Sequence, residues 1–211
     1  MEYYKLTDKL NNNEVVKCNG NNYCVYSCGM EEWIPTNIFT QYLCLDSEFF
    51  GKFVSISEDE AIRIINEKRT QLNDLLKLAY NVAKEAHTGQ LDKGGNDYFN
   101  HPQAVSNALY DTEHKIVAYL HDVVEDTATT LQNLADLGFT SRIVKSVGAI
   151  SKTKGVSYEK YLEQVKQDSN ARYVKIEDIK HNMELKRIAN PTEKDFARLK
   201  KYQKALIYLD D

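Results

Sequence analysis

The residues of this 211-residue chain that are best suited to chemistry lie between His121 and Asp126. Residues three and four apart are neighbours on a helix, so His121, Asp122 and the pair Glu125-Asp126 would share one face, with two valines on the other. Imidazole and carboxylate groups gathered on one face favour a divalent cation such as Mn²⁺, Fe²⁺ or Zn²⁺. Taken alone, the same hexapeptide is equally typical of a solvated, ion-paired helix face.

Two other segments add side chains of the ligand type. His101 lies at a loop-to-helix boundary just before Pro102, where a lone histidine is more often a cap or a surface residue. Asp178 and Asn182 would share one face of a later helix, which by itself also fits an exposed charged helix. Together, two histidines and two aspartates make a complete ligand set for one metal ion.

A series of helices must position these side chains. Ser57 is placed to cap a helix that begins with three acidic residues, and apolar residues then recur at helical spacing from Ile62 to Val82. A glycine-containing loop follows at 89–95. The later helices are expected at about 102–110, 113–126, 130–137, 140–151, 157–168, 170–188 and 192–210, interrupted by Gly138, Gly155 and Asn190-Pro191. Residues 58–211 therefore predict an all-α bundle.

The first 57 residues predict a small β-rich module. They hold all four cysteines, 10 of the 22 aromatic residues and no arginine. The β-prone runs 14–18 and 23–28 flank Asn19-Gly20-Asn21-Asn22, a pattern typical of a hairpin. The runs 38–45 and 49–56 are each expected to add a strand or one helical turn. The chain is thus predicted to be mainly α, with a β-rich module at 1–57 and a helical domain at 58–211.

The cysteines at 18, 24, 28 and 44 are weak candidates for a metal site. Their spacing lacks the paired C-x2–4-C knuckles that zinc modules favour. Buried thiols that behave as small hydrophobes are the favoured interpretation, and disulfides are not expected in a reducing cytoplasm. The module is therefore expected to pack, dock or dimerise.

The overall composition excludes several classes of protein. With 42% hydrophobic residues and a net charge of −4, the chain is not expected to be disordered. It has no apolar run of about 18 residues and no glycine-rich phosphate loop, and its first residues lack the apolar stretch of a secretory leader, so secretion is not expected. The mild acidity of the whole chain argues against a nucleic-acid partner. Residues 170–204 hold ten basic and five acidic side chains, and this local basic excess is interpreted mainly as a solvated helix face. A cytoplasmic protein without a membrane partner is expected.

The ordered set of His101, His121-Asp122 and Asp178 resembles the HD-domain metal-dependent phosphohydrolases. More narrowly, residues 79–187 resemble the hydrolase domain of the RelA/SpoT-homologue family, in its small stand-alone form. The resemblance rests on five landmarks in order: Ala86-His87-Thr88-Gly89-Gln90, Tyr98-Phe99-Asn100-His101-Pro102, the run from Leu120 to Thr127, Lys175-Ile176-Glu177-Asp178 and His181-Asn182-Met183.

This resemblance implies an HD-type helical bundle that removes the 3′-pyrophosphate from (p)ppGpp, the stringent-response nucleotide. It implies one divalent ion, which by family habit is Mn²⁺, with Zn²⁺ or Fe²⁺ as alternatives. The implied partner is a small-molecule nucleotide, and the oligomeric state stays open. The implied roles are metal ligation by His101, His121, Asp122 and Asp178, water activation by Glu125 and Asp126, and substrate contact by Lys93, Tyr98, Lys175 and Asn182.

The chain departs from the family pattern at two positions. Asp92 stands where the family's hydrolases usually have an arginine that stacks on guanine, and Glu177 stands where alanine is usual. An aspartate cannot stack on a purine as a guanidinium does, and it repels phosphate. Two alternatives therefore remain: hydrolysis of another phosphoester, such as a nucleoside monophosphate or the 2′-phosphate of NADPH, and a non-catalytic nucleotide sensor. Structural roles are expected for His87 and His181, and a surface position for His114.

Overall fold

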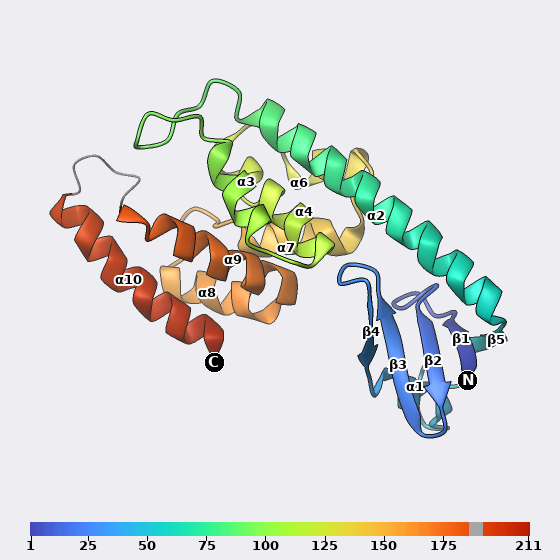
Figure 1. Cartoon of the computed structure of the whole chain (residues 1–211). Helices are drawn as coiled ribbons and strands as arrows, with labels where there is room; N and C mark the ends of the chain where they lie inside the picture. The colour runs from blue at the N-terminus through green and yellow to red at the C-terminus, as the bar shows by residue number, and fades with distance from the viewer. Residues whose placement is uncertain (186–191) are drawn as a thin grey trace. The chain divides into compact units, whose positions relative to one another are not determined.

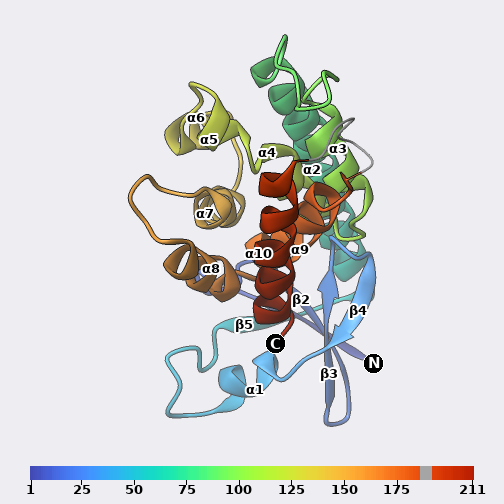
Figure 2. The same cartoon turned by 90° about the vertical axis from the view of Figure 1, so that its left-hand side faces the viewer.

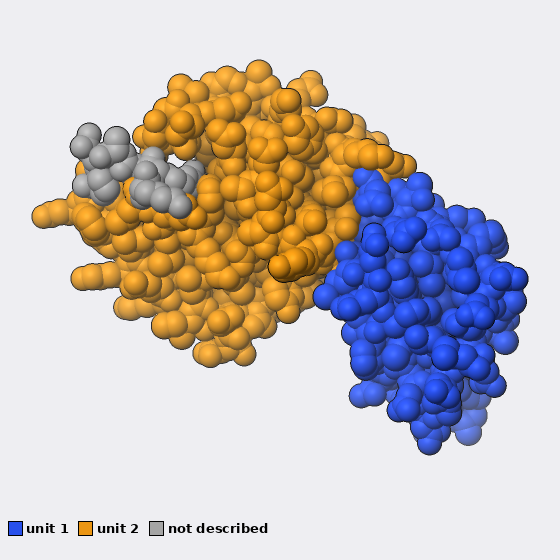
Figure 3. All heavy atoms as spheres, viewed as in Figure 1, with its two compact units in different colours: residues 1–73 blue, residues 74–211 orange. Residues whose placement is uncertain are grey.

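A computed structural model of the chain describes residues 1–185 and 192–211 (Figure 1). The chain divides into two compact units, residues 1–73 and 74–211, coloured separately in Figure 3. The boundary between these units falls inside the long helix α2, Glu58–Ala86. The domain boundary predicted at residue 57 stays a prediction, because α2 belongs partly to each unit.

An antiparallel five-stranded sheet forms most of the first unit. Its strand order is β4-β3-β2-β1-β5. The strands are β1 (Glu2–Leu6), β2 (Val15–Asn19), β3 (Asn22–Ser27), β4 (Glu32–Pro35) and β5 (Phe53–Ile56). The hairpin predicted from the Asn/Gly turn is β2–β3, and Gly20 has a φ of +61° there, which glycine adopts without strain.

Two of the short runs in this unit adopt the expected structures. The run 38–45 contains the helix α1, Ile38–Leu43, and the run 49–56 supplies β5. No strand was predicted at the positions of β1 and β4. These strands have only five and four residues, and each gains its hydrogen bonds from neighbouring strands.

Successive residues of a strand point to opposite faces, so the sheet has two apolar sides. On one side, Val16 and Leu6 pack with Phe39 and Tyr42, which lie on α1. On the other side, Val15 packs with apolar residues from the first turns of α2, at 61, 64 and 65. The prediction of buried thiols is correct only for Cys18: the other three cysteines are half-buried or exposed and belong to neither of these two clusters.

The second unit is helical, as predicted. After α2, its helices are α3 (Asn100–Asn107), α4 (Thr112–Leu120), α5 (Val123–Asp126), α6 (Leu131–Asp136), α7 (Ser141–Ile150), α8 (Tyr158–Gln167), α9 (Ser169–Asn182) and α10 (Glu193–Asp210). Helix α9 packs against α3, α4, α7, α8 and α10, and Figure 2 shows α9 beside α10. In the described ranges, no helix is both long enough and apolar enough to span a membrane.

Two predicted helix bounds are wrong. The helix predicted at 113–126 is interrupted at residues 121 and 122, for a reason that lies in the candidate site. The helix predicted at 170–188 ends at Asn182, a residue of low helix propensity, and the Met183 amide closes its last turn on the Ile179 carbonyl at 3.0 Å. The remainder of that prediction from residue 186, with the Asn190-Pro191 break, lies outside the described residues.

Candidate metal centre and substrate pocket

The structure brings the four predicted metal ligands together where α3, α4 and α9 pack against one another. Nε2 of His101 lies 3.0 Å from Asp178 Oδ1 and 3.5 Å from Asp122 Oδ2. Nε2 of His121 lies 3.1 Å from Asp122 Oδ2 and 3.7 Å from Asp178 Oδ1. The ligand atoms of His101, His121 and Asp178 all lie within 4.8 Å of one another, a grouping that could hold one metal ion, and Asp122 adjoins both histidines.

The electrostatics of the cluster also fit a cation. His121 is buried, and no described group forms a hydrogen bond with its Nε2. Burial disfavours the charged imidazole, but the Asp122 and Asp178 carboxylates outweigh burial and raise the pKa of His121 well above the usual histidine value. The two carboxylates thus favour a positive charge at this point, which a divalent ion would supply.

The orientation of His121 explains the break between α4 and α5. Its Nδ1 lies 2.7 Å from the carbonyl oxygen of Ala118, to which it donates. In a continuous helix that carbonyl would accept from the amide of Asp122. The imidazole therefore competes with the helical ladder, and this contact fixes the tautomer that leaves the Nε2 lone pair facing the carboxylates.

Both carboxylate oxygens of Asp178 are held by neighbours on α9. Lys175 Nζ lies 2.8 Å from Oδ2, and the Asn182 side-chain amide donates to Oδ1 at 2.6 Å. Burial raises the pKa of the Asp178 carboxyl, but Lys175 and the two ligand histidines outweigh it and hold that pKa well below its usual range. Lys175 and Asn182, predicted as substrate contacts, thus also position a predicted metal ligand.

Tyr98 connects a second metal ligand to the acidic pair. Its hydroxyl donates to Asp122 Oδ2 at 2.7 Å and lies 3.1 Å from Asp126 Oδ2. Burial and these two carboxylates raise the pKa of Tyr98, so its hydroxyl keeps the proton. Asp126 therefore contacts the metal-ligand network through Tyr98.

Glu125, the other predicted catalytic acid, faces the pocket beside the ligands. Its Oε1 accepts a hydrogen bond from the backbone amide of Lys152 at 2.6 Å. Desolvation of the Glu125 carboxyl raises its pKa above the usual value, and this effect exceeds the opposing influence of the Lys152 amide and of Lys175. A carboxylate of raised pKa is suited to accept a proton near neutral pH.

A pocket of about 350 Å³ opens above these groups. It is lined by all four predicted substrate contacts, by Glu125, and by His101, Asp122 and Asp178 of the ligand set. Two residues of α10 that were not predicted, Arg198 and Tyr202, also line it. The basic excess at 170–204 was the only feature of the sequence that pointed towards Arg198, because α10 reaches the site only through tertiary packing.

The loop before α3 forms another wall of this pocket, with Asp92 in it. The Asp92 carboxylate accepts hydrogen bonds from the amides of Gly94 and Asn96, at 2.8 and 2.9 Å. Asp92 therefore braces the loop that presents Lys93, whose Nζ lies 4.0 Å from Asp195 Oδ1. At 2.8 Å from the same oxygen, the Arg198 guanidinium adds a second cation to this side.

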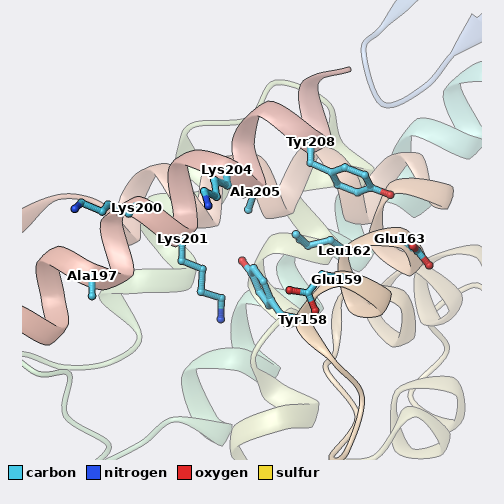
Figure 4. Close-up of a pocket in the computed structure, with 10 residues that line it drawn as sticks. All are labelled: Tyr158, Glu159, Leu162, Glu163, Ala197, Lys200, Lys201, Lys204, Ala205 and Tyr208. Atoms are coloured by element: carbon cyan, nitrogen blue, oxygen red, sulfur yellow. The ribbon is translucent and has the colours of Figure 1, made fainter.

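A larger cavity of about 570 Å³ lies between α8 and α10 (Figure 4). Lys200, Lys201 and Lys204 line it from α10, and Tyr158 and Glu159 line it from α8. None of its lining residues belongs to the ligand cluster or to the acidic pair. The chemistry therefore identifies the smaller pocket as the candidate site.

The remaining histidines have three different environments. His87 is buried, with Nδ1 2.8 Å from Gln90 Oε1, in agreement with its expected structural role. His181 contacts His101, with their Nδ1 atoms 2.7 Å apart, which agrees with an expected hydrogen-bonded role. His114, expected at the surface, is half-buried: its ring packs on Tyr173 with centroids 4.8 Å apart, and burial lowers its pKa.

Comparison with known proteins identifies the family of the second unit. A family model described as the HD domain matches residues 79–199, more than half of the chain. The bifunctional (p)ppGpp synthase/hydrolase SpoT of Escherichia coli K12 is 34% identical over 122 residues, which cover 51% of this chain and 17% of that protein. The bifunctional (p)ppGpp synthase/hydrolase RelA of Mycobacterium tuberculosis is 32% identical over 129 residues, covering 56% of this chain and 18% of that protein.

Solved structures also share the fold, and one of them comes from work titled "A metazoan ortholog of SpoT hydrolyzes ppGpp and plays a role in starvation responses". Its TM-score is 0.55 with 20% sequence identity, over 64% of this chain and 84% of that one. This likeness concerns the fold alone, and the chain spans less than a fifth of the length of the two curated relatives above.

Proposed function

Because this chain belongs to the HD-domain family, we propose that it is a metal-dependent phosphohydrolase that removes the 3′-pyrophosphate from (p)ppGpp. The observation that carries the proposal is the convergence of three metal-ligand candidates, Glu125 and several cationic side chains on one pocket. The matched region of the relatives that are named for this nucleotide supports the substrate class.

The proposed metal ligands are His101, His121, Asp122 and Asp178, with Mn²⁺ as the proposed ion. When bound, such an ion would lower the pKa of a water molecule and neutralise charge that develops on the phosphoryl group. Four protein ligands fit this chemistry because they leave coordination positions for water and for substrate.

Glu125 and Asp126 act as the proposed proton acceptors of the reaction. The water oxygen forms a bond to the phosphorus next to the 3′ oxygen, and the bond between that phosphorus and the 3′ oxygen breaks. The products are pyrophosphate and the nucleoside 5′-diphosphate, or the 5′-triphosphate from pppGpp. The acidic pair takes a proton from the water and delivers it to the departing 3′ oxygen, which leaves as a hydroxyl. Lys93 and Arg198 supply positive charge for the phosphates from the opposite wall.

Asp92 favours a second candidate substrate within the same reaction class. Its carboxylate lines the pocket where a base-stacking guanidinium would be expected, so selection for guanine is weakened. Another phosphoester, either a nucleoside monophosphate or the 2′-phosphate of NADPH, is then the competing substrate.

The test is a turnover assay with purified protein and Mn²⁺ over ppGpp, GMP and NADPH. Pyrophosphate release from ppGpp alone supports the proposal, and orthophosphate release from either other nucleotide supports the second candidate. Tight nucleotide binding without turnover in any divalent metal would contradict both and indicate a sensor.

The matched variants are Asp122→Ala and Asp136→Ala. The first removes a proposed ligand and is expected to abolish metal binding and turnover. The second removes an exposed carboxylate on α6 and should leave both unchanged. Full activity of D122A would refute the mechanism.

A further inference from the structure

The two ligand histidines are held in place by different kinds of acceptor. His121 donates from Nδ1 to a backbone carbonyl, which is an acceptor in every state of the protein. His101 instead faces another imidazole: its Nδ1 lies 2.7 Å from Nδ1 of His181, and the rings stack with centroids 4.9 Å apart at 23°. His181 follows Asp178 by three residues, so α9 supplies both a proposed ligand and this partner.

Two nitrogen atoms at this distance share one proton. Two N–H groups would repel each other, and so would two lone pairs. Either His101 donates, so that its Nε2 has a free lone pair, or His181 donates, so that the proton of His101 lies on Nε2. Only the first arrangement leaves His101 able to bind a cation through Nε2, the atom that faces Asp178 and Asp122.

We propose that His181 is a positioning residue of the metal centre. Its Nδ1 accepts a hydrogen bond from Nδ1 of His101 and so fixes the tautomer and ring orientation of that ligand. The inference rests on the metal site of the proposed function, but on neither its substrate nor its reaction. It assigns the proton of metal-loaded His181 to Nε2. Partners of this kind typically contribute 10–100-fold to metal affinity.

Two substitutions separate the hydrogen bond from the ring packing. His181→Phe keeps an aromatic ring against His101 but removes the acceptor. His181→Asn keeps an acceptor, since the Asn Oδ1 occupies about the position of the histidine Nδ1. His114→Phe is the matched control, because His114 also packs against an aromatic ring of the same unit but lies outside the cluster.

The measurement is Mn²⁺ affinity of the full chain without nucleotide, from the electron paramagnetic resonance signal of the free ion. We expect H181F to bind Mn²⁺ at least tenfold more weakly than the wild type, with H181N within about threefold and H114F unchanged. Equal affinity of H181F and wild type, or equal losses in H181F and H181N, would overturn the proposal.

A spectroscopic test on the unmodified chain does not depend on the folding of any variant. In the Zn²⁺-loaded protein, long-range ¹H–¹⁵N correlation spectra should show the His101 proton on Nδ1 and the His181 proton on Nε2. A proton on Nδ1 of His181 would overturn the proposal. If the wild type binds the ion with this tautomer pattern but hydrolyses no nucleotide, only the proposed function fails; if it binds no ion, both fail.

Discussion

Removal of one hydroxyl, in Tyr98→Phe, tests whether the network around the ligands stabilises the second unit. The phenylalanine keeps the ring contacts with His87 and His101, whose centroids lie 4.9 and 5.9 Å away. It loses the 2.7 Å hydrogen bond to the Asp122 carboxylate. Hydrogen bonds to charged groups contribute about 1.5–3 kcal/mol, so the metal-free variant should be less stable by about that amount.

Urea unfolding followed by circular dichroism measures this loss. With a slope of about 2 kcal/mol per molar urea, the midpoint should fall by about 1 M. The helices provide the signal for the second unit, while Trp33, the single tryptophan, lies on β4 and reports on the first unit by fluorescence. Mn²⁺ affinity of the variant should also fall about tenfold, because Asp122 loses a group that orients it.

The matched control for this experiment is Tyr119→Phe. Tyr119 is buried and stacks on Phe99 with centroids 6.1 Å apart, but in the described part of the chain its hydroxyl has no side-chain hydrogen bond. Its midpoint should change by no more than about 0.3 M, since the expected loss is below about 0.5 kcal/mol. If Y98F unfolds within the same margin of the wild type, the assigned role of the hydroxyl is wrong.

Three other predictions follow from the same structure. Glu125→Gln should reduce kcat by about 10²–10⁴-fold with Mn²⁺ affinity retained, and an unchanged kcat would exclude Glu125 as the base. In the wild type, kcat/KM should fall as pH drops through the raised pKa of Glu125, because the base must be deprotonated. Removal of the metal by a chelator should lower the melting temperature, and Mn²⁺ at about 100 times its Kd should restore about 2.7 kcal/mol of unfolding free energy, measured calorimetrically. No change in the melting temperature would mean that the folded protein binds no ion. Asp8→Ala should destabilise the first unit by about 2–4 kcal/mol at pH 7, because the buried carboxylate accepts from the Tyr42 hydroxyl and from the amides of Leu10 and Asn11. Burial raises the pKa of Asp8, but Tyr42 and these amides outweigh burial and lower it. The contribution of Asp8 to the free energy of unfolding is therefore present above the usual aspartate pKa and is lost as pH falls through the lowered pKa. A stability difference between D8A and the wild type that persists in strong acid, measured by Trp33 fluorescence, would contradict this.

Local sequence patterns predicted most elements of the fold. Helical periodicity and capping placed α2 correctly, including Ser57, whose hydroxyl accepts from the amide of Glu60 at 3.1 Å. The Asn/Gly turn placed the β2–β3 hairpin. These features succeed because their determinants lie within a few residues of one another.

The missed features depend on partners that are distant in the chain. The strands β1 and β4 are short and are stabilised by neighbouring strands. The helix at 113–126 breaks because the imidazole of His121 takes the carbonyl of Ala118, and a hydrophobic pattern contains no information on that competition. Tyr98 was predicted as a substrate contact from its motif, whereas its hydrogen bond to Asp122 depends on how the turn before α3 packs against the segment between α4 and α5.

By itself, the sequence determined which residue types are available for chemistry and their order along the chain: two histidines, two aspartates and an acidic pair in a helical context. Tertiary structure alone decided that the two ligand histidines lie 3.0–3.7 Å from the aspartate oxygens and that α10 brings Arg198 to the pocket. The physical reason is that ligand identity is a local covalent property. Distances between ligands, and the desolvation that shifts their pKa values, arise only when segments about 20 to 80 residues apart pack together.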